Sequence, residues 1–447
     1  KAKVGTDYVL STNTDIYEYD LTSKKTTNLT EGMMGYDTNP QYSKEGVLAW
    51  LSMAHNGNES DKNDLYILKN GKRINLTAQW DNTIFSYRWS NDGKQIYLIA
   101  PTQGTEQLFV VDVYSKNTNP RQLTQGVFDV NSIVGQAGDQ LVVIRTDMNH
   151  AAELYTINLE EKKKEYLSLT QLSHFNDEQY KQIAQCPIKE RIIKTTDGKD
   201  MHAWVIYPPD FDPNKKYPTL LYCQGGPQSI VSQFYSFRWN FQLMTSQGYI
   251  VIAPNRRGLP GFGVEWNAQI SGDWGGQPMR DYLSAIDDIA KEPYVDKDRL
   301  GAVGASYGGY SIYYLAGIHQ KRFKTFIAHC GVFNLESMYG TTEELFFNNN
   351  EIGGAYWEER NAVAQKSYKE FNPIKKINNW DTPILIIHGG KDYRVPEEQG
   401  FQAFTAAQLK GIRSELLYFP DENHWVLQPQ NGLLWQRTFF KWLKETL

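Results

Sequence analysis

Alternating hydrophobic and polar positions fill the first 170 residues and predict short β-strands. Four such runs occupy residues 15–19, 64–68, 107–111 and 153–157. Each run precedes a Leu-Thr dipeptide, and the four leucines are Leu29, Leu76, Leu123 and Leu169. Their spacing of 47, 47 and 46 residues is a period. Four short strands in each period of this length are typical of a β-propeller blade.

The repeat predicts a β-propeller domain of about four blades over residues 1–185. A β-sandwich with chance similarity would not keep its register over three successive intervals. A closed propeller contains about 4–8 blades, so either this ring is small or further blades precede residue 1. The second reading is favoured because the chain is strand-rich from its start, and we therefore expect a partial propeller.

A different pattern begins near residue 186, where apolar runs alternate with amphipathic helices. Asp197-Gly198 marks a hairpin between two strands. The expected strands cover residues 191–195, 201–207, 219–223, 249–253, 300–304, 325–329, 384–388 and 415–419, and helices are expected at 279–291 and 431–445. This alternation predicts a mainly parallel, doubly wound sheet covered on both faces over residues 186–447, as in an α/β-hydrolase.

Composition and charge narrow the classes of function. The 447 residues are 40% hydrophobic and 22% charged, with a net charge of -5 and no basic block, so nucleic acid is not an expected partner. No apolar run approaches the ~18 residues that cross a membrane, and residues 1–20 lack a signal-peptide pattern. The three cysteines, Cys186, Cys223 and Cys330, are too few and too far apart for a disulfide framework or a zinc cluster.

Ser306 is the candidate nucleophile. It lies in Gly304-Ala305-Ser306-Tyr307-Gly308, directly after an apolar strand and at the start of a helical segment. The tight turn of a nucleophile elbow exposes the serine hydroxyl and needs small residues two positions before and after it. The bare motif is weak, but its position between a strand and a helix supports the catalytic reading.

Asp392 and His424 are the candidate partners of this serine. Both follow predicted strands, in the chain order Ser, Asp, His that this fold requires. His388 is a rival base, but a buried strand end favours a structural histidine. Asp421 and Glu422 are rival acids that we expect to cap a turn, because they directly precede His424.

Two groups are candidates to stabilise the oxyanion. One is the backbone N–H of Tyr307, and the other comes from the loop Gln224-Gly225-Gly226-Pro227 after the strand at 219–223. In that loop the donor is either the Gln224 side-chain amide or a neighbouring backbone N–H. A plain Gly-Gly-Pro turn is the alternative. The chemistry requires no metal ion or cofactor.

Several motifs together resemble the prolyl oligopeptidase family of serine peptidases, in the branch of acylaminoacyl peptidases and bacterial dipeptidyl peptidases of type 5. They are Gln224-Gly225-Gly226-Pro227, Arg257-Gly258, Trp274-Gly275-Gly276, residues 304–310, residues 388–396 and His424. The resemblance implies a β-propeller that caps an α/β-hydrolase domain and admits short peptides. It also suggests a periplasmic or secreted protein and leaves a homodimer open.

The resemblance further implies the residues that hold substrate. Arg394 matches the arginine that binds the carbonyl of the second substrate residue, although pairing with a carboxylate is the structural alternative. The implied specificity pocket is lined by Tyr307, Val332, Leu335, Met338 and Val395, with Trp357 as a further contributor. These apolar residues suit a hydrophobic or small substrate side chain, and they could equally be core.

The expected activity is release of amino-terminal dipeptides from short peptides. An acylaminoacyl peptidase, oligopeptidase or esterase would use the same triad, and an inactive propeller binding protein is the alternative outside enzymes. The acidic residues that hold a free amino terminus in dipeptidyl peptidases could not be identified in this sequence. Dipeptidyl activity is therefore implied by the resemblance alone.

Overall fold

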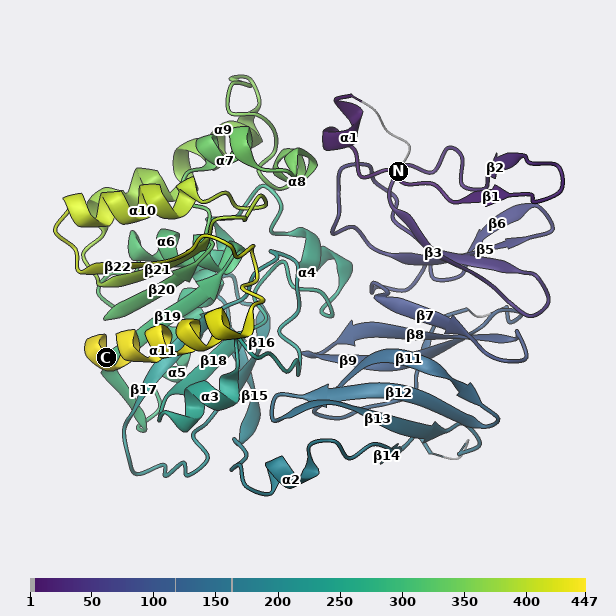
Figure 1. Cartoon of the computed structure of the whole chain (residues 1–447), viewed down its shortest axis with the longest axis horizontal. Helices are drawn as coiled ribbons and strands as arrows, with labels where there is room; N and C mark the ends of the chain where they lie inside the picture. Colours follow the sequence, from purple (N-terminus) through teal and green to yellow (C-terminus); the bar gives the residue numbers. More distant parts are fainter. Residues whose placement is uncertain (1–4, 117, 162–163) are drawn as a thin grey trace. The chain divides into compact units, whose positions relative to one another are not determined.

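The computed structural model describes residues 5–116, 118–161 and 164–447, which form two compact units (Figure 1). The first unit consists of Lys1–Ile183 together with two later segments, Ser232–Tyr235 and Pro260–Ala268. The second unit consists of Ala184–Val231, Ser236–Leu259 and Gln269–Leu447. The chain therefore leaves the second unit twice and returns to it.

Antiparallel sheets make up the first unit. A two-stranded sheet pairs β1 (Tyr17–Tyr19) with β2 (Thr26–Asn28). Three four-stranded sheets follow, in chain order: β3 (Asp37–Tyr42), β4 (Leu48–Ser52), β5 (Asp64–Lys69) and β6 (Lys72–Asn75); β7 (Ser86–Trp89), β8 (Gln95–Thr102), β9 (Thr105–Asp112) and β10 (Arg121–Gln122); β11 (Asp129–Ala137), β12 (Gln140–Asp147), β13 (His150–Asn158) and β14 (Leu169–Gln171). Its short helices are α1 (Asp7–Leu10), α2 (Asp177–Tyr180) and α4 (Val264–Ala268).

The Leu-Thr repeat has a structural cause in this unit. In three of the four repeats the buried threonine hydroxyl accepts a hydrogen bond from a backbone N–H of the strand run that precedes it. Thr30, Thr77 and Thr124 accept in this way from Ile16, Leu65 and Leu108, at 2.9, 2.9 and 3.0 Å. The repeated dipeptide thus ties the outer strand of each sheet to its neighbour.

Consecutive sheets pack through their apolar faces. On β8, Leu98 packs with residues of the preceding sheet such as Leu51, whereas Ile99 packs with residues of the following sheet such as Leu141. Both faces of the strand are therefore buried, as alternation of side chains across a strand requires. The predicted four-stranded units are confirmed, but the described strands do not close into a ring.

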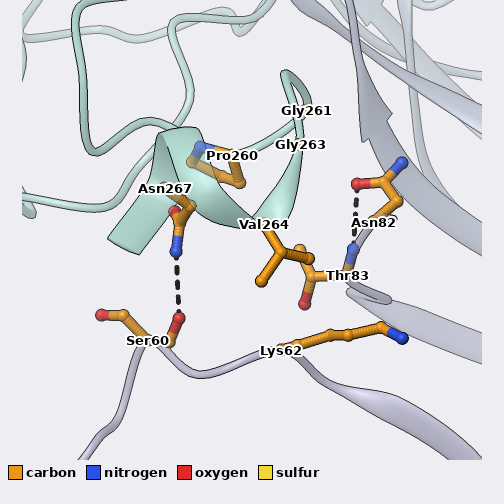
Figure 2. A pocket seen from close by; sticks show the side chains of 9 residues that line it. All are labelled: Ser60, Lys62, Asn82, Thr83, Pro260, Gly261, Gly263, Val264 and Asn267. Carbon is orange, nitrogen blue, oxygen red and sulfur yellow. Dashed lines mark hydrogen bonds between the residues drawn. The ribbon is translucent and has the colours of Figure 1, made fainter. Parts of the chain in front are cut away.

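The segment Pro260–Ala268 is attached to the first unit by specific contacts. The Asn267 amide donates to the Ser60 carbonyl at 3.0 Å, and the backbone N–H of Val264 donates to Asp81 at 2.9 Å. Figure 2 shows Asn267 pointing to Ser60 across a small pocket. This pocket is lined by Ser60, Lys62, Asn82, Thr83, Pro260, Gly261, Gly263, Val264 and Asn267. No acid, histidine or cysteine lines it, so it lacks the groups of a hydrolytic site.

An eight-stranded sheet forms the centre of the second unit, in the order β15-β16-β18-β17-β19-β20-β21-β22. Its strands are β15 (Ile188–Lys194), β16 (Asp200–Ile206), β17 (Tyr217–Cys223), β18 (Ile250–Pro254), β19 (Val295–Ala305), β20 (Thr325–His329), β21 (Ile384–Gly389) and β22 (Ser414–Phe419). From β18 to β22 neighbouring strands are parallel, while β15 and β16 are antiparallel to their neighbours. The predicted mainly parallel sheet is therefore confirmed.

Helices cover both faces of this sheet, and Figure 1 shows α10 and α11 on opposite sides of β21 and β22. The helices are α3 (Phe241–Ser246), α5 (Gln277–Ile289), α6 (Tyr307–Ala316), α7 (Leu335–Thr341), α8 (Leu345–Glu351), α9 (Ala362–Glu370), α10 (Glu398–Leu409), α11 (Pro429–Thr446) and the 3-10 helix η1 (Pro373–Asn379). No helix among the described residues is both long and apolar enough to cross a membrane.

Candidate active site

Ser306 lies at the sharp turn between β19 and α6. Its φ of 60° is in the left-handed region, which is uncommon for a residue with a side chain, and α6 begins at the next residue. A Cβ atom on Gly308 would overlap the carbonyl oxygen of Cys223, and one on Gly304 would lie 2.7 Å from the same oxygen. The two glycines therefore let the turn lie directly against the end of β17.

The Asp392 and His424 side chains meet in the second unit, and His424 also faces Cys330, the residue after β20, which pairs with β19. Nδ1 of His424 and Oδ2 of Asp392 are 2.6 Å apart, and both residues are buried. The other carboxylate oxygen of Asp392 accepts the backbone N–H groups of Arg394 and Val395 at 3.1 and 2.9 Å. These bonds fix the carboxylate, which in turn holds a proton on Nδ1 and leaves Nε2 available as a base.

The surroundings of His424 change its basicity. Burial lowers the pKa of the imidazole, but the negative charge of Cys330 and the hydrogen bond to Asp392 raise it, and the pKa rises overall to about 10. The protonated ring is therefore strongly stabilised, which favours proton uptake by this histidine.

The three alternative candidates, His388, Asp421 and Glu422, form other contacts in the structure. Nε2 of His388 lies 2.8 Å from the carbonyl oxygen of Val395, so this nitrogen carries a proton and donates it. The Glu422 carboxylate accepts the backbone N–H groups of Leu427 and Gln428 ahead of α11, at 2.8 and 3.1 Å. Asp421 is exposed and pairs with Lys391. These contacts favour structural roles for all three.

The loop after β17 passes close to Ser306. A Cβ atom on Gly225 would lie 3.0 Å from the carbonyl oxygen of Ala305 and 3.4 Å from Cβ of Ser306, so the lack of a side chain lets this loop lie close to the turn. The Gln224 amide bonds within its own loop, donating to Ser229 and Ile230 at 3.3 Å each. Arg256, which is fully buried, donates to the carbonyls of Gln224 and Pro227 and thereby anchors the loop. The Gln224 side-chain amide is thus engaged within its own loop, which favours the backbone over this side chain as the candidate donor.

Tyr307 contributes its backbone and its side chain differently. As the first residue of α6 it has a backbone N–H without an acceptor inside the helix. Its ring is buried, and its hydroxyl donates to the Trp274 carbonyl at 2.8 Å while the Arg256 guanidinium lies 4.5 Å from the ring centre. The ring is therefore part of the core of the second unit.

The other expected substrate residues divide into two groups. Val332, Leu335, Met338 and Val395 are buried. Trp357 is 62% exposed and packs against Tyr339 and Tyr356. Arg394 pairs with Glu344 at 2.8 Å and lies over the Trp425 ring. Any substrate carbonyl bound by Arg394 therefore competes with a carboxylate.

Two residues beside His424 were not expected from the sequence. Sγ of Cys330 lies 3.8 Å from Nε2 of His424, and the Arg238 guanidinium donates to the His424 carbonyl at 3.2 Å. Cys330 is the residue after β20, whose end was predicted correctly. Its position at the same sheet edge as Ser306 could have been found from that strand, whereas Arg238 carries no such signal.

Comparison with known proteins identifies the family. Residues 235–447 match the prolyl oligopeptidase family. The chain is 51% identical to dipeptidyl-peptidase 5 of Porphyromonas gingivalis, with all of this chain and 64% of that protein covered. It is 33% identical to dipeptidyl-peptidase 5 of Schizosaccharomyces pombe, covering 97% of this chain and 62% of that protein. The chain thus spans just under two thirds of the length of these curated relatives.

Solved structures share the fold. An acylaminoacyl peptidase of Pyrococcus horikoshii aligns with a TM-score of 0.83 at 20% identity, covering 97% of this chain and 66% of that one. Dipeptidyl peptidase 4 of Porphyromonas gingivalis aligns with a TM-score of 0.74 at 20% identity, covering 97% of this chain and 60% of that one. The second unit has the α/β-hydrolase fold, and residues 235–447 belong to the prolyl oligopeptidase family of serine peptidases.

Proposed function

We propose that this chain hydrolyses short peptides and releases their amino-terminal dipeptides, with Ser306, His424 and Asp392 as its catalytic triad. The observation that carries the proposal is the 2.6 Å hydrogen bond between Nδ1 of His424 and Asp392. It is supported by the sharp turn between β19 and α6 that holds Ser306. The 51% identity to a dipeptidyl-peptidase 5 supports the substrate class.

In the proposed reaction, Oγ of Ser306 attacks the peptide carbonyl while Nε2 of His424 takes its proton. Asp392 holds the ring and stabilises its charge. The tetrahedral oxyanion accepts hydrogen bonds from the Tyr307 N–H and from a backbone N–H of the loop at residues 224–226. His424 then returns the proton to the leaving amine, and water repeats the sequence to release the dipeptide.

The antiparallel sheets of the first unit have a proposed role as blades of a β-propeller, with the unit boundary near residue 185. Their four-stranded meanders and their 46 to 47 residue repeat support this proposal. The proposed peptide-binding residues are Arg394 and the buried set of Val332, Leu335, Met338 and Val395, whose apolar side chains suit a hydrophobic or small residue.

Hydrolysis of chromogenic dipeptide substrates, with free and with blocked amino termini, tests this function. We expect cleavage of the free dipeptides, no cleavage by Ser306→Ala and undiminished cleavage by Ser311→Ala. Ser311 is a matched control because it lies on α6 and its hydroxyl donates only to the Tyr307 carbonyl within that helix. Preference for blocked substrates would overturn the dipeptidyl assignment, and equal activity of Ser306→Ala would overturn the triad.

A further inference from the structure

Cys330 is a buried nucleophilic group that the proposed reaction does not use. Ala305 and His329 are paired in the parallel strands β19 and β20, so Ser306 and Cys330 are the next residues along two adjacent strands. Both therefore reach the edge of the sheet where His424 lies. Cys330 also has a φ of 41°, in the left-handed region like Ser306.

Sγ of Cys330 and Nε2 of His424 face one another at 3.8 Å. On the other side of the ring, Nδ1 is occupied by Asp392, so the lone pair of the neutral imidazole is on Nε2. Thiolate sulfur and imidazole nitrogen are the ligands preferred by Zn²⁺ and similar soft cations. A carboxylate behind the imidazole is the usual support of a metal-binding histidine.

We propose that Cys330 and His424 form a binding site for a soft divalent cation such as Zn²⁺, which inhibits the chain by occupying the imidazole nitrogen that catalysis needs. The inhibitory consequence rests on the proposed function, whereas the binding itself does not. This site needs only one cysteine and one histidine. The wide spacing of the three cysteines excludes a zinc cluster built from several cysteines, but it does not exclude a site of this kind.

The spacing of the two atoms fits one shared cation. A tetrahedral zinc ion, with bonds of about 2.3 Å to sulfur and about 2.0 Å to nitrogen, separates these ligands by roughly 3.5 Å. The observed separation of 3.8 Å needs only a small adjustment. Cys330, Asp392 and His424 are the described residues whose potential ligand atoms gather within 4.8 Å of one another.

The local charges also allow a cation. When Cys330 is a thiolate, it and Asp392 carry two negative charges, against one positive charge on Arg238, which reaches the His424 carbonyl. On binding, the thiol proton leaves to solvent, the sulfur forms a bond to the cation, and the imidazole donates its lone pair from Nε2. Because protons compete for both ligands, binding strengthens as the pH rises.

Titration of the full chain with Cd²⁺ alone tests the binding, because cadmium thiolates give a charge-transfer absorption band. We expect one equivalent of bound Cd²⁺ with this band in the unmodified protein and in Cys186→Ser, and no band in Cys330→Ser. Cys186 is a matched control, since its thiol is also buried but bonds to Thr245. A band that persists in Cys330→Ser would overturn the proposed site.

Inhibition of dipeptide hydrolysis by Zn²⁺ tests the consequence. Cys330→Ser is expected to need about tenfold more Zn²⁺ or more for half-inhibition, since loss of even a supporting group weakens metal sites on this scale. Equal sensitivity of the two proteins would overturn the inhibitory role. A protein that shows the Cys330-dependent cadmium band but cleaves no peptide would overturn the proposed function and leave the metal site in place.

Discussion

The hydrogen bond between Asp392 and His424 sets the tautomer of the imidazole. In Asp392→Asn, the amide oxygen can still accept the backbone N–H groups of Arg394 and Val395, but the amide nitrogen then donates to Nδ1 of His424. The ring then carries its proton on Nε2 and cannot act as a base. We expect kcat to fall roughly 10⁴-fold with the fold retained.

Steady-state hydrolysis of a free dipeptide substrate measures this effect, with Asp421→Asn as the control. Asp421 is a suitable control because it is an exposed acid whose carboxylate forms an ion pair with Lys391. A loss of similar size in both variants would contradict a special role of Asp392.

Cys330 tunes the pH range of the same histidine. The negative charge of this residue raises the pKa of His424, so activity that needs a neutral ring is lost as the pH falls through that pKa. Cys330→Ala removes this charge and should move the acidic limb of kcat/KM to lower pH. The pH profile of Cys186→Ala is the control, and an unmoved limb in Cys330→Ala would contradict this influence of Cys330 on His424.

The turn between β19 and α6 tolerates only small residues where the helix approaches β17. In Gly308→Ala the added methyl group overlaps the Cys223 carbonyl and must displace α6, and Ser306 with it. We expect a loss of about 1–3 kcal/mol in the free energy of unfolding, together with a large loss of kcat.

Gly432→Ala is the matched control on another helix of the same unit. Gly432 lies within α11 with nothing within 4 Å of its added methyl group, so alanine should stabilise the protein by roughly 0.5–1 kcal/mol. Urea unfolding of both variants gives the comparison. Equal stability of Gly308→Ala and the unmodified protein would contradict the tight approach.

The elements that the sequence predicted best are those whose pattern has a local physical cause. β20 was predicted to the residue because a fully buried parallel strand reads as a continuous apolar run. The triad candidates followed because the fold fixes their chain order and their positions after strands. The end of β20 already placed Cys330 at the sheet edge of Ser306, but its contact with His424 was not predicted, because no motif includes this cysteine.

At the scale of the whole molecule, the segments Ser232–Tyr235 and Pro260–Ala268 were the least predictable part of the fold. They are short, and nothing in their polarity distinguishes a loop of the second unit from a segment packed in the first. Asn267 shows the reason. Its side chain bonds to the backbone carbonyl of Ser60, and since every residue has such a carbonyl, the sequence does not mark the partner. The local pattern of hydrophobic and polar positions therefore identifies the two units, but it does not assign every residue to the correct unit.

A pair of carboxyl groups, the half-buried Glu106 and the buried Asp129, makes the first unit sensitive to pH. Burial, together with the charge of Asp129, raises the pKa of Glu106 to about 8. A carboxyl group whose pKa is raised by folding contributes stability below its unfolded pKa, and this contribution is lost as the pH rises through the folded value. The first unit should therefore lose stability from about pH 4 to about pH 8.

Glu106→Gln removes this titration and should leave the unit more stable than the unmodified protein near pH 8, while the difference near pH 5 is smaller. Hydrogen exchange of the amides in β9 and β11 measures the change within that unit. The exposed Glu160→Gln serves as the control. Identical pH dependence of exchange in Glu106→Gln and the unmodified protein would contradict the raised pKa.

The two excursions of the chain between the units have a consequence for proteolysis. A single nick between Ile183 and Ala184 would cut the linker that joins the bulk of the two units. The segment at 260–268 would still be held in the first unit by Asn267 and Val264, and its ends run into the second. The two fragments should therefore co-purify under native conditions and separate only in denaturant, because non-covalent contacts of this segment still hold them together.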